Sequence, residues 1–184
     1  MDYTTQMKEA EISVSDYVDR YVRAKEFIEY CRQCPNYGRI WSCPEYDFDT
    51  EEYFRKFSTL RVIGLKIIYS PEMREKTLSR EELREVIAGS LRVERKKLDE
   101  YLRGLEEETG GTALNAGSCT LCPEGCARPD GESCRFPGRM RYSLESLGAD
   151  ITATIGDLLG IDLIWDSEGK LPEYYTLVAG LLYD

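Results

Sequence analysis

The cysteines of this chain lie in two tight groups, and the chain contains no histidine. Thiols packed this closely either form disulfides or hold metal, and the lack of histidine excludes every metal site that needs imidazole. All-sulfur coordination remains, which means an iron–sulfur cluster or zinc. The first group is Cys31, Cys34 and Cys43, and the second is Cys119, Cys122, Cys126 and Cys134.

Chain length and the N-terminal residues bear on the choice between disulfides and metal. The 184 residues fit one domain, since domains usually hold roughly 100–200 residues, and we predict a single metal-binding domain over residues 1–184. No run of about 18 apolar residues occurs, and residues 1–6 lack the basic start and apolar stretch of a secretory signal. We therefore expect a cytoplasmic, reducing location, where disulfides are uncommon. Seven cysteines would also leave one thiol unpaired.

The chain is strongly acidic. It has 24 basic and 34 acidic side chains, which gives a net charge of −10. An acidic surface repels nucleic-acid phosphates and anionic lipid. We therefore expect no nucleic-acid partner and no membrane partner. An acidic surface also suits docking to a basic protein redox partner, although we prefer the interpretation that the charge serves solubility.

The hydrophobic pattern predicts an α+β fold. Residues 60–69 (LRVIGLKIIY) are rich in branched side chains, which is typical of a buried strand. Ser79 and Glu82 form a capping-box pattern at the start of the longest predicted helix, and residues 109–111 (TGG) end that helix. Shorter strands are predicted at 112–116, 161–165 and 174–182, with a turn at 166–169 between the last two.

Short helices are predicted where a capping residue or a closing glycine bounds an apolar spacing. They cover residues 14–22, 50–57, 143–147 and 152–159, with Ser13 or Ser15 and Asp49 or Thr50 as the caps of the first two. The first of these helices leads the chain to Cys31. We expect one small mixed sheet with packed helices, and two cysteine-rich metal-binding loops at one edge of that sheet.

The second cysteine group is a local quartet. Cys119 and Cys122 have the short spacing that lets two thiolates reach neighbouring iron atoms while the amides of their loop face the sulfurs. Cys126 and Cys134 complete the set, and residues 117–138 contain enough proline and glycine to predict an irregular loop. The cysteine spacing is compatible with both a [4Fe–4S] cluster and zinc. We prefer a [4Fe–4S] cluster as the cofactor and keep zinc as the alternative.

The first group has only three cysteines. Three thiolates leave one iron of a cubane open to water, substrate or a carboxylate. Glu45, which lies just after Cys43, is a candidate to close that shell. In the zinc alternative, the closely spaced pair of each group converges on one tetrahedral ion, which leaves three cysteines without a shared role. The two groups together therefore predict one or two clusters.

Arginines and aromatic residues surround the cysteines. We include Arg135, next to Cys134, among the cofactor-binding residues, because a guanidinium stabilises an anionic cluster and raises its potential. An equally good interpretation is that these arginines lie at the surface and face solvent. The remaining residues of this kind are Arg128, Arg139 and Arg141 near the second group, and Tyr37, Trp41 and Tyr46, which flank the first group and could shield a cluster.

Four segments resemble a known family. They are residues 31–44 (CRQCPNYGRIWSCP), 117–122 (GSCTLC), 134–137 (CRFP) and 141–151 (RYSLESLGADI). Over roughly residues 25–184, the chain resembles the cysteine-rich predicted metal-binding proteins of unknown function from methanogenic archaea and anaerobic bacteria. The resemblance implies a metal or iron–sulfur protein of anaerobic metabolism, with all seven cysteines as candidate ligands.

These observations favour an iron–sulfur protein that transfers electrons or supplies redox support to another enzyme. One alternative is an enzyme in which a three-cysteine cluster binds substrate at its open iron. A second alternative is a zinc-stabilised interaction module without redox activity. The sequence contains no nucleotide-binding glycine motif and no histidine that could act as a general base.

Overall fold

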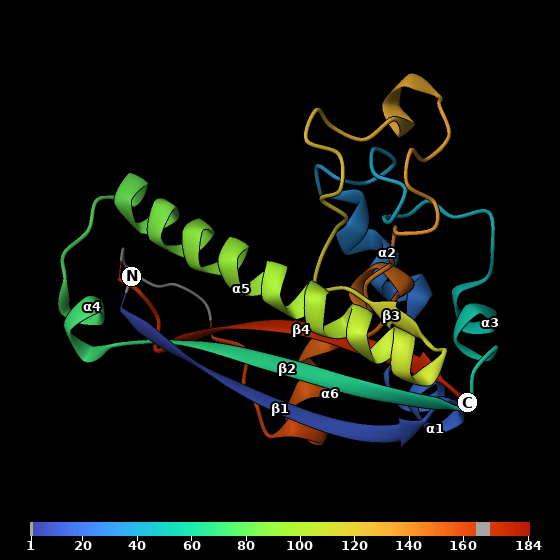
Figure 1. Ribbon diagram of the computed structural model, residues 1–184, viewed down its shortest axis with the longest axis horizontal. Helices are drawn as coiled ribbons and strands as arrows, with labels where there is room; N and C mark the ends of the chain where they lie inside the picture. The colour runs from blue at the N-terminus through green and yellow to red at the C-terminus, as the bar shows by residue number, and fades with distance from the viewer. Residues whose placement is uncertain (1, 165–169) are drawn as a thin grey trace.

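The computed structural model describes residues 2–164 and 170–184, and its centre is a four-stranded sheet (Figure 1). The strands are β1 (Tyr3–Ser13), β2 (Thr59–Tyr69), β3 (Thr112–Leu114) and β4 (Tyr174–Tyr183), in the order β1-β2-β4-β3. The predicted α+β class is confirmed. The sheet is antiparallel at every pairing, whereas we expected a mixed sheet. Two pairs of strands run the same way, but β2 separates β1 from β4 and β4 separates β2 from β3, so no parallel pair forms in this sheet.

Strand β1 is the longest element that the sequence pattern did not predict. It pairs with β2 along its whole length, from Tyr3 opposite Tyr69 to Ser13 opposite Thr59. Every β1 side chain is at least partly exposed, so the segment lacks the apolar run by which β2 could be predicted. Its backbone pairing with a buried central strand holds it in place.

Helix α5 (Arg80–Thr109) covers one face of the sheet. The predicted capping box is present at its start, where Ser79 accepts from the Glu82 amide and the Glu82 carboxylate accepts from the Ser79 amide. Gly110 ends the helix in the left-handed conformation, with φ of 69°, which a glycine adopts without steric cost. The buried side chains between α5 and the sheet include Leu98, Leu102, Leu105, Ile63, Leu65 and Leu181.

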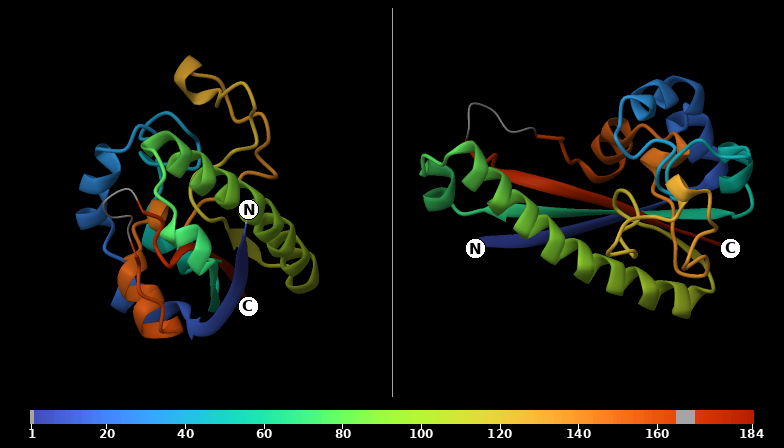
Figure 2. Two further views of the ribbon diagram at one scale, coloured as in Figure 1. Left: turned by 90° about the vertical axis from the view of Figure 1, so that its left-hand side faces the viewer. Right: turned by 90° about the horizontal axis from the view of Figure 1, so that it is seen from above.

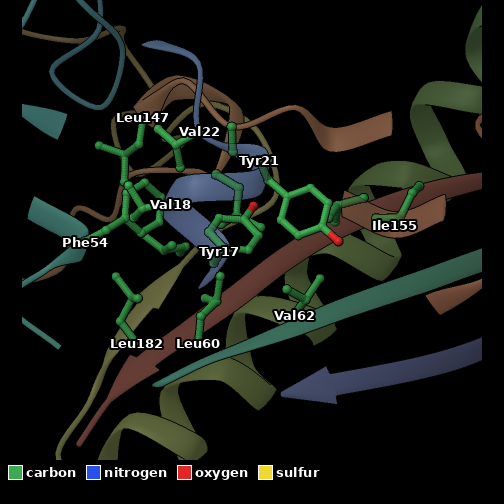
Figure 3. Close-up of a cluster of buried hydrophobic side chains, with 14 of the residues drawn as sticks. Tyr17, Val18, Tyr21, Val22, Phe54, Leu60, Val62, Leu147, Ile155 and Leu182 are labelled. Atoms are coloured by element: carbon green, nitrogen blue, oxygen red, sulfur yellow. The ribbon is translucent and has the colours of Figure 1, made fainter. Parts of the chain in front are cut away.

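The opposite face of the sheet is covered by α1 (Val14–Tyr21) and α6 (Ile151–Leu159), as the left-hand view of Figure 2 shows. Ser13 caps α1 by accepting from the Asp16 amide, and Asp150 caps α6 by accepting from the Ala153 amide. Figure 3 shows the largest buried cluster between these helices and the strands. Its labelled members include Tyr17, Val18, Tyr21, Leu60, Val62, Ile155 and Leu182.

The remaining elements are short. They are α2 (Ala24–Arg32), α3 (Thr50–Phe54), α4 (Pro71–Glu75), and the 3-10 turns η1 (Arg128–Asp130) and η2 (Glu145–Leu147). Asp49 caps α3 by accepting from the Glu51 and Glu52 amides, as the sequence predicted. Among residues 2–164 and 170–184, no helix combines the length and apolar character needed to cross a membrane.

One predicted strand is wrong. Residues 161–164 are irregular, and residue 165 and the predicted turn at 166–169 lie outside the described residues. The Ile161 amide donates to the Ile155 carbonyl at the end of α6, and its side chain is buried in the core beside that helix. This short apolar run is therefore the segment that leaves α6 and packs partly into the core, and it is not a strand. Composition alone does not distinguish these two structures.

Candidate metal centre

The second cysteine segment follows the edge strand β3 and continues to η2. Most of it is irregular, as predicted, and Gly117, Gly125 and Gly131 adopt positive φ angles at its bends. In Figure 1 it lies side by side with the first cysteine segment, beyond the β3 side of the sheet. Both cysteine segments therefore lie at the same edge, as the sequence predicted.

All four cysteines of the second group line one cavity of about 410 Å³. The cavity is also lined by Arg135 and by apolar side chains that come from both cysteine segments. These apolar residues include Ile40, Trp41, Leu121, Phe136 and Met140. The first segment thus supplies part of the wall around the cysteines of the second.

The thiols of this group also affect one another electrostatically. Burial raises the pKa of Cys119, and the backbone amide of Leu121 opposes that rise. The neighbouring thiols of Cys134, Cys122 and Cys126 raise it further. Because a thiolate next to other thiolates is costly, these groups favour a cation that neutralises their charge, and metal binding would release their protons.

The first group gathers at the end of α2. Cys31 lies in the last turn of that helix, Cys34 is exposed, and Cys43 is partly buried. Burial raises the pKa of Cys43 to about 11, with the Ser42 hydroxyl opposing the rise and the thiols of Cys34 and Cys31 adding to it. The three predicted ligands of this group are therefore close enough to interact.

A carboxylate that the sequence did not single out lies beside the first group. Glu145 and Glu45 both line a cavity of about 420 Å³ together with Cys31. The charge of Glu145 raises the pKa of both Cys31 and Cys43. Glu45, the candidate for the fourth ligand, lies beside the Tyr37 hydroxyl and raises the pKa of that hydroxyl.

Burial raises the pKa of Glu145 itself. Its own backbone amide, the Ser143 hydroxyl, the Gly117 amide and the charge of Arg95 oppose that rise. No spacing signal links Glu145 to the cysteines, because it is far from Cys43 in the sequence and only the packing of η2 against α2 brings the two segments together.

Direct hydrogen bonds join the two cysteine segments. The Cys119 amide donates to the buried Ser42 hydroxyl at 2.8 Å, and the Asn36 side-chain amide donates to the Ser118 hydroxyl at 3.2 Å. The Trp41 indole donates to the Glu132 carbonyl at 3.1 Å. Ser42 was not among the predicted site residues, since a serine beside a cysteine carries no specific signal.

Arg128 makes the most contacts between the segments. Its guanidinium donates to the carbonyls of Ile40 at 3.0 Å, Cys43 at 2.6 Å and Glu45 at 2.6 Å. It also lies over the Trp41 ring, 5.0 Å from its centroid. Arg128 therefore fastens the first segment to the second, and the predicted shielding residue Trp41 lines the cavity of the second group instead of covering the first.

The other arginines divide by position. Arg135 lines the cysteine cavity and donates to the Gly125 carbonyl at 2.9 Å. Arg141 forms an ion pair with Glu106 of α5 at 2.6 Å, which ties the segment to the helix. Arg139 is exposed and lines a neighbouring cavity. Of the four, Arg135 is placed where its charge would act on a bound group.

The chemistry of the donor set fits an all-sulfur metal site. Four thiols line one cavity, and the chain has no histidine to replace any of them. Within the described ranges, no three Cys, Asp or Glu side chains are already arranged around one point as ligands of a single ion. The cysteine side chains would therefore have to move to bind a metal.

Comparison with known proteins bears directly on this site. The model of a family described as "Predicted metal-binding protein (DUF2284)" matches residues 17–183. The chain belongs to this family. All seven cysteines of this DUF2284 member lie inside the matched region, as do Ser42, Arg128 and Glu145, whereas β1 precedes it. Searches of curated proteins and of solved structures gave no significant match.

Proposed function

We propose that Cys119, Cys122, Cys126 and Cys134 bind one [4Fe–4S] cluster, and that the protein transfers electrons to or from a protein redox partner. The observation that carries this proposal is the single cavity of about 410 Å³ lined by all four thiols. Zinc held by these four thiolates at about 2.3 Å is the alternative, and it needs less space than a cluster. A cubane uses the space, because its four ligands bind separate iron atoms.

The surroundings of the cavity support a redox role. When bound, the cluster supplies one-electron chemistry, at a potential set by nearby charge, hydrogen bonds and solvent exposure. Arg135 places positive charge at the cavity wall, and Trp41 and Phe136 add apolar surface that limits water. The charge of Arg135 would stabilise the more negative, reduced state of the cluster, and the two apolar side chains would limit the access of solvent to it.

The first group favours a second candidate function. With Cys31, Cys34 and Cys43 as thiolate ligands, a cubane has one iron free for a carboxylate or a substrate. Glu145 is the carboxylate whose charge acts on Cys31 and Cys43. If it ligates, the site is closed and suits electron transfer. If it does not, the open iron is a Lewis acid at which an enzyme binds its substrate.

Metal content of anaerobically purified protein tests both parts. We expect iron and acid-labile sulfide, with about four iron atoms per filled site. Cys122→Ser should lose the iron of the second group, Cys34→Ser should lose the iron of the first, and Ser133→Ala, an exposed change in the same loop, should lose none. Glu145→Gln should make the spectrum of the reduced protein sensitive to added cyanide, whereas Glu45→Gln should not.

The zinc-stabilised module makes the opposite prediction. Zinc near stoichiometry without sulfide would overturn the cluster proposal for both groups. Full iron content in Cys34→Ser protein would restrict the cluster to the second group. A wild-type spectrum that already responds to cyanide would favour the enzyme over the electron carrier.

A further inference from the structure

A further large cavity is separate from the cysteine cavity, although the two share a wall. It has a volume of about 1030 Å³ and is lined by residues of α5, of β4 and of the cysteine loop, and by Ile151 at the start of α6. Thr120 and Leu121, the two residues between Cys119 and Cys122, line both cavities. A molecule bound here would therefore touch the loop that carries the cysteines.

The edge of β4 forms the floor of this cleft. Among the described strands, β3 is the one that pairs with the outer side of β4, at residues 180–182. Residues 175–178 line the cleft, next to this short pairing.

Buried polar atoms in the cleft lack partners among the described residues. Arg95 Nε and Asp99 Oδ1 of α5 and Thr176 Oγ1 of β4 are all buried without a hydrogen bond. Leaving such atoms unpaired costs about 1–3 kcal/mol each, so they call for a ligand or ordered water. Arg95 Nε needs an acceptor, and Asp99 Oδ1 needs a donor.

The position of Arg95 is set by the cysteine loop. Its guanidinium also donates to the Ser118 carbonyl, next to Cys119. Asp99 follows one helical turn later, and its pKa is raised by burial, with Arg95 and Arg103 opposing that rise. The pair therefore presents a guanidinium and a partly buried carboxyl to the same cleft.

The charge and apolar character of the lining indicate the class of ligand. Four basic side chains face two acidic ones in a protein whose net charge is −10. The basic residues are Arg92, Arg95, Lys96 and Arg103, and the acidic ones are Asp99 and Glu145. The rest of the wall is largely aliphatic, with Leu91, Ile151, Leu163 and Leu177 among its members. Such a lining favours an anion with an apolar body.

We propose that this cleft binds a small organic anion whose charge is held at Arg95, whose neighbouring hydrogen-bond donor is held at Asp99, and whose apolar body lies against the aliphatic wall. A 2-hydroxy carboxylate has this combination of groups. The site stands on the cleft alone and does not depend on which metal the cysteines hold. Its contact with residues 120–121 places the ligand against the cysteine loop.

Calorimetric titration of the purified, metal-containing protein with three probes tests the ligand class. The probes are 2-hydroxyoctanoate, octanoate and octylammonium, which share an apolar body. We expect a dissociation constant of about 1 mM or lower for 2-hydroxyoctanoate, weaker binding of octanoate, and no binding of octylammonium. Hydrogen exchange should slow in residues 174–179 and 88–103 when the first probe binds. Equal affinity for the cation, or no binding of either anion, overturns the proposal and leaves only water in the cleft.

Variants locate the site. Arg95→Gln should weaken 2-hydroxyoctanoate binding by about tenfold or more, since a charge-assisted contact is lost. Arg84→Gln, an exposed change on the same helix outside the cleft, should leave it unchanged. Because Arg95 also contacts the cysteine loop, the double variant Arg92→Gln/Lys96→Gln provides a second test. Unchanged affinity in that double variant and in Arg95→Gln overturns the site, whatever the metal content shows.

Discussion

At the scale of single residues, Tyr3 connects the unpredicted strand β1 to helix α5. Its hydroxyl donates to Glu94 Oε1 at 2.8 Å, and Lys97 Nζ donates to the same oxygen at 2.8 Å. The Glu94 residue is only 3% exposed. We expect Tyr3→Phe to lower the free energy of unfolding at pH 7 by about 2 kcal/mol, because a buried carboxylate loses a hydrogen bond. Urea unfolding measures this loss.

The same contact has a pH dependence of known sign. Burial and then the bond to Glu94 raise the pKa of Tyr3 to about 12, against about 10 in the unfolded chain. The folded state therefore holds a proton that the unfolded state has lost, so this contribution is full below pH 10 and disappears as pH rises through 12. Tyr3→Phe should lose stability less steeply across that window. Tyr30→Phe, at an exposed tyrosine, should keep the wild-type slope, and an unchanged slope in Tyr3→Phe would contradict the prediction.

At the scale of elements, the two cysteine segments form one unit because Arg128 holds them together. We expect Arg128→Ala to lower the free energy of unfolding by about 2–3 kcal/mol, because the charge-assisted hydrogen bonds of Arg128 reach three carbonyls of the first segment. Arg128→Lys should recover only part of this, because an ammonium lacks the planar fork. Hydrogen exchange should accelerate in residues 31–46 in both variants. The control is Arg39→Ala, at an exposed arginine of that segment. Equal effects of Arg39→Ala and Arg128→Ala would show that Arg128 does not hold the two segments together.

At the scale of the whole molecule, stability has two sources. The sheet and α5 are held by apolar burial, with β2 paired on both sides, whereas residues 117–138 have few regular hydrogen bonds and several prolines. Metal binding should supply the folding free energy of the cysteine segments. Removal of metal by a chelator should therefore speed hydrogen exchange in residues 117–138 and leave β2 and α5 protected. Uniform protection in metal-free protein would show that the loop orders itself.

Local signals in the sequence predicted the elements that depend on local chemistry. The Asp49 cap, the Ser79–Glu82 capping box and the Gly110 end all act within a few residues, and all are present. Strand β2 was predictable because its branched residues are buried. Strand β1 was not, because its pairing depends on β2 rather than on its own side chains. The strand prediction for residues 161–164 was wrong for a related reason, because an apolar segment can pack into the core without forming a strand.

The sequence by itself determined the kind of metal chemistry open to this protein, because seven thiols and no imidazole restrict the ligands whatever the fold. It also determined the α+β class, since hydrophobic period and caps are local properties. Only the tertiary structure decided that Glu145 lies beside the first group and that Arg128 joins the two cysteine segments. These contacts connect residues far apart in the chain, and their geometry depends on how the sheet, α2 and α5 pack, which no local pattern encodes.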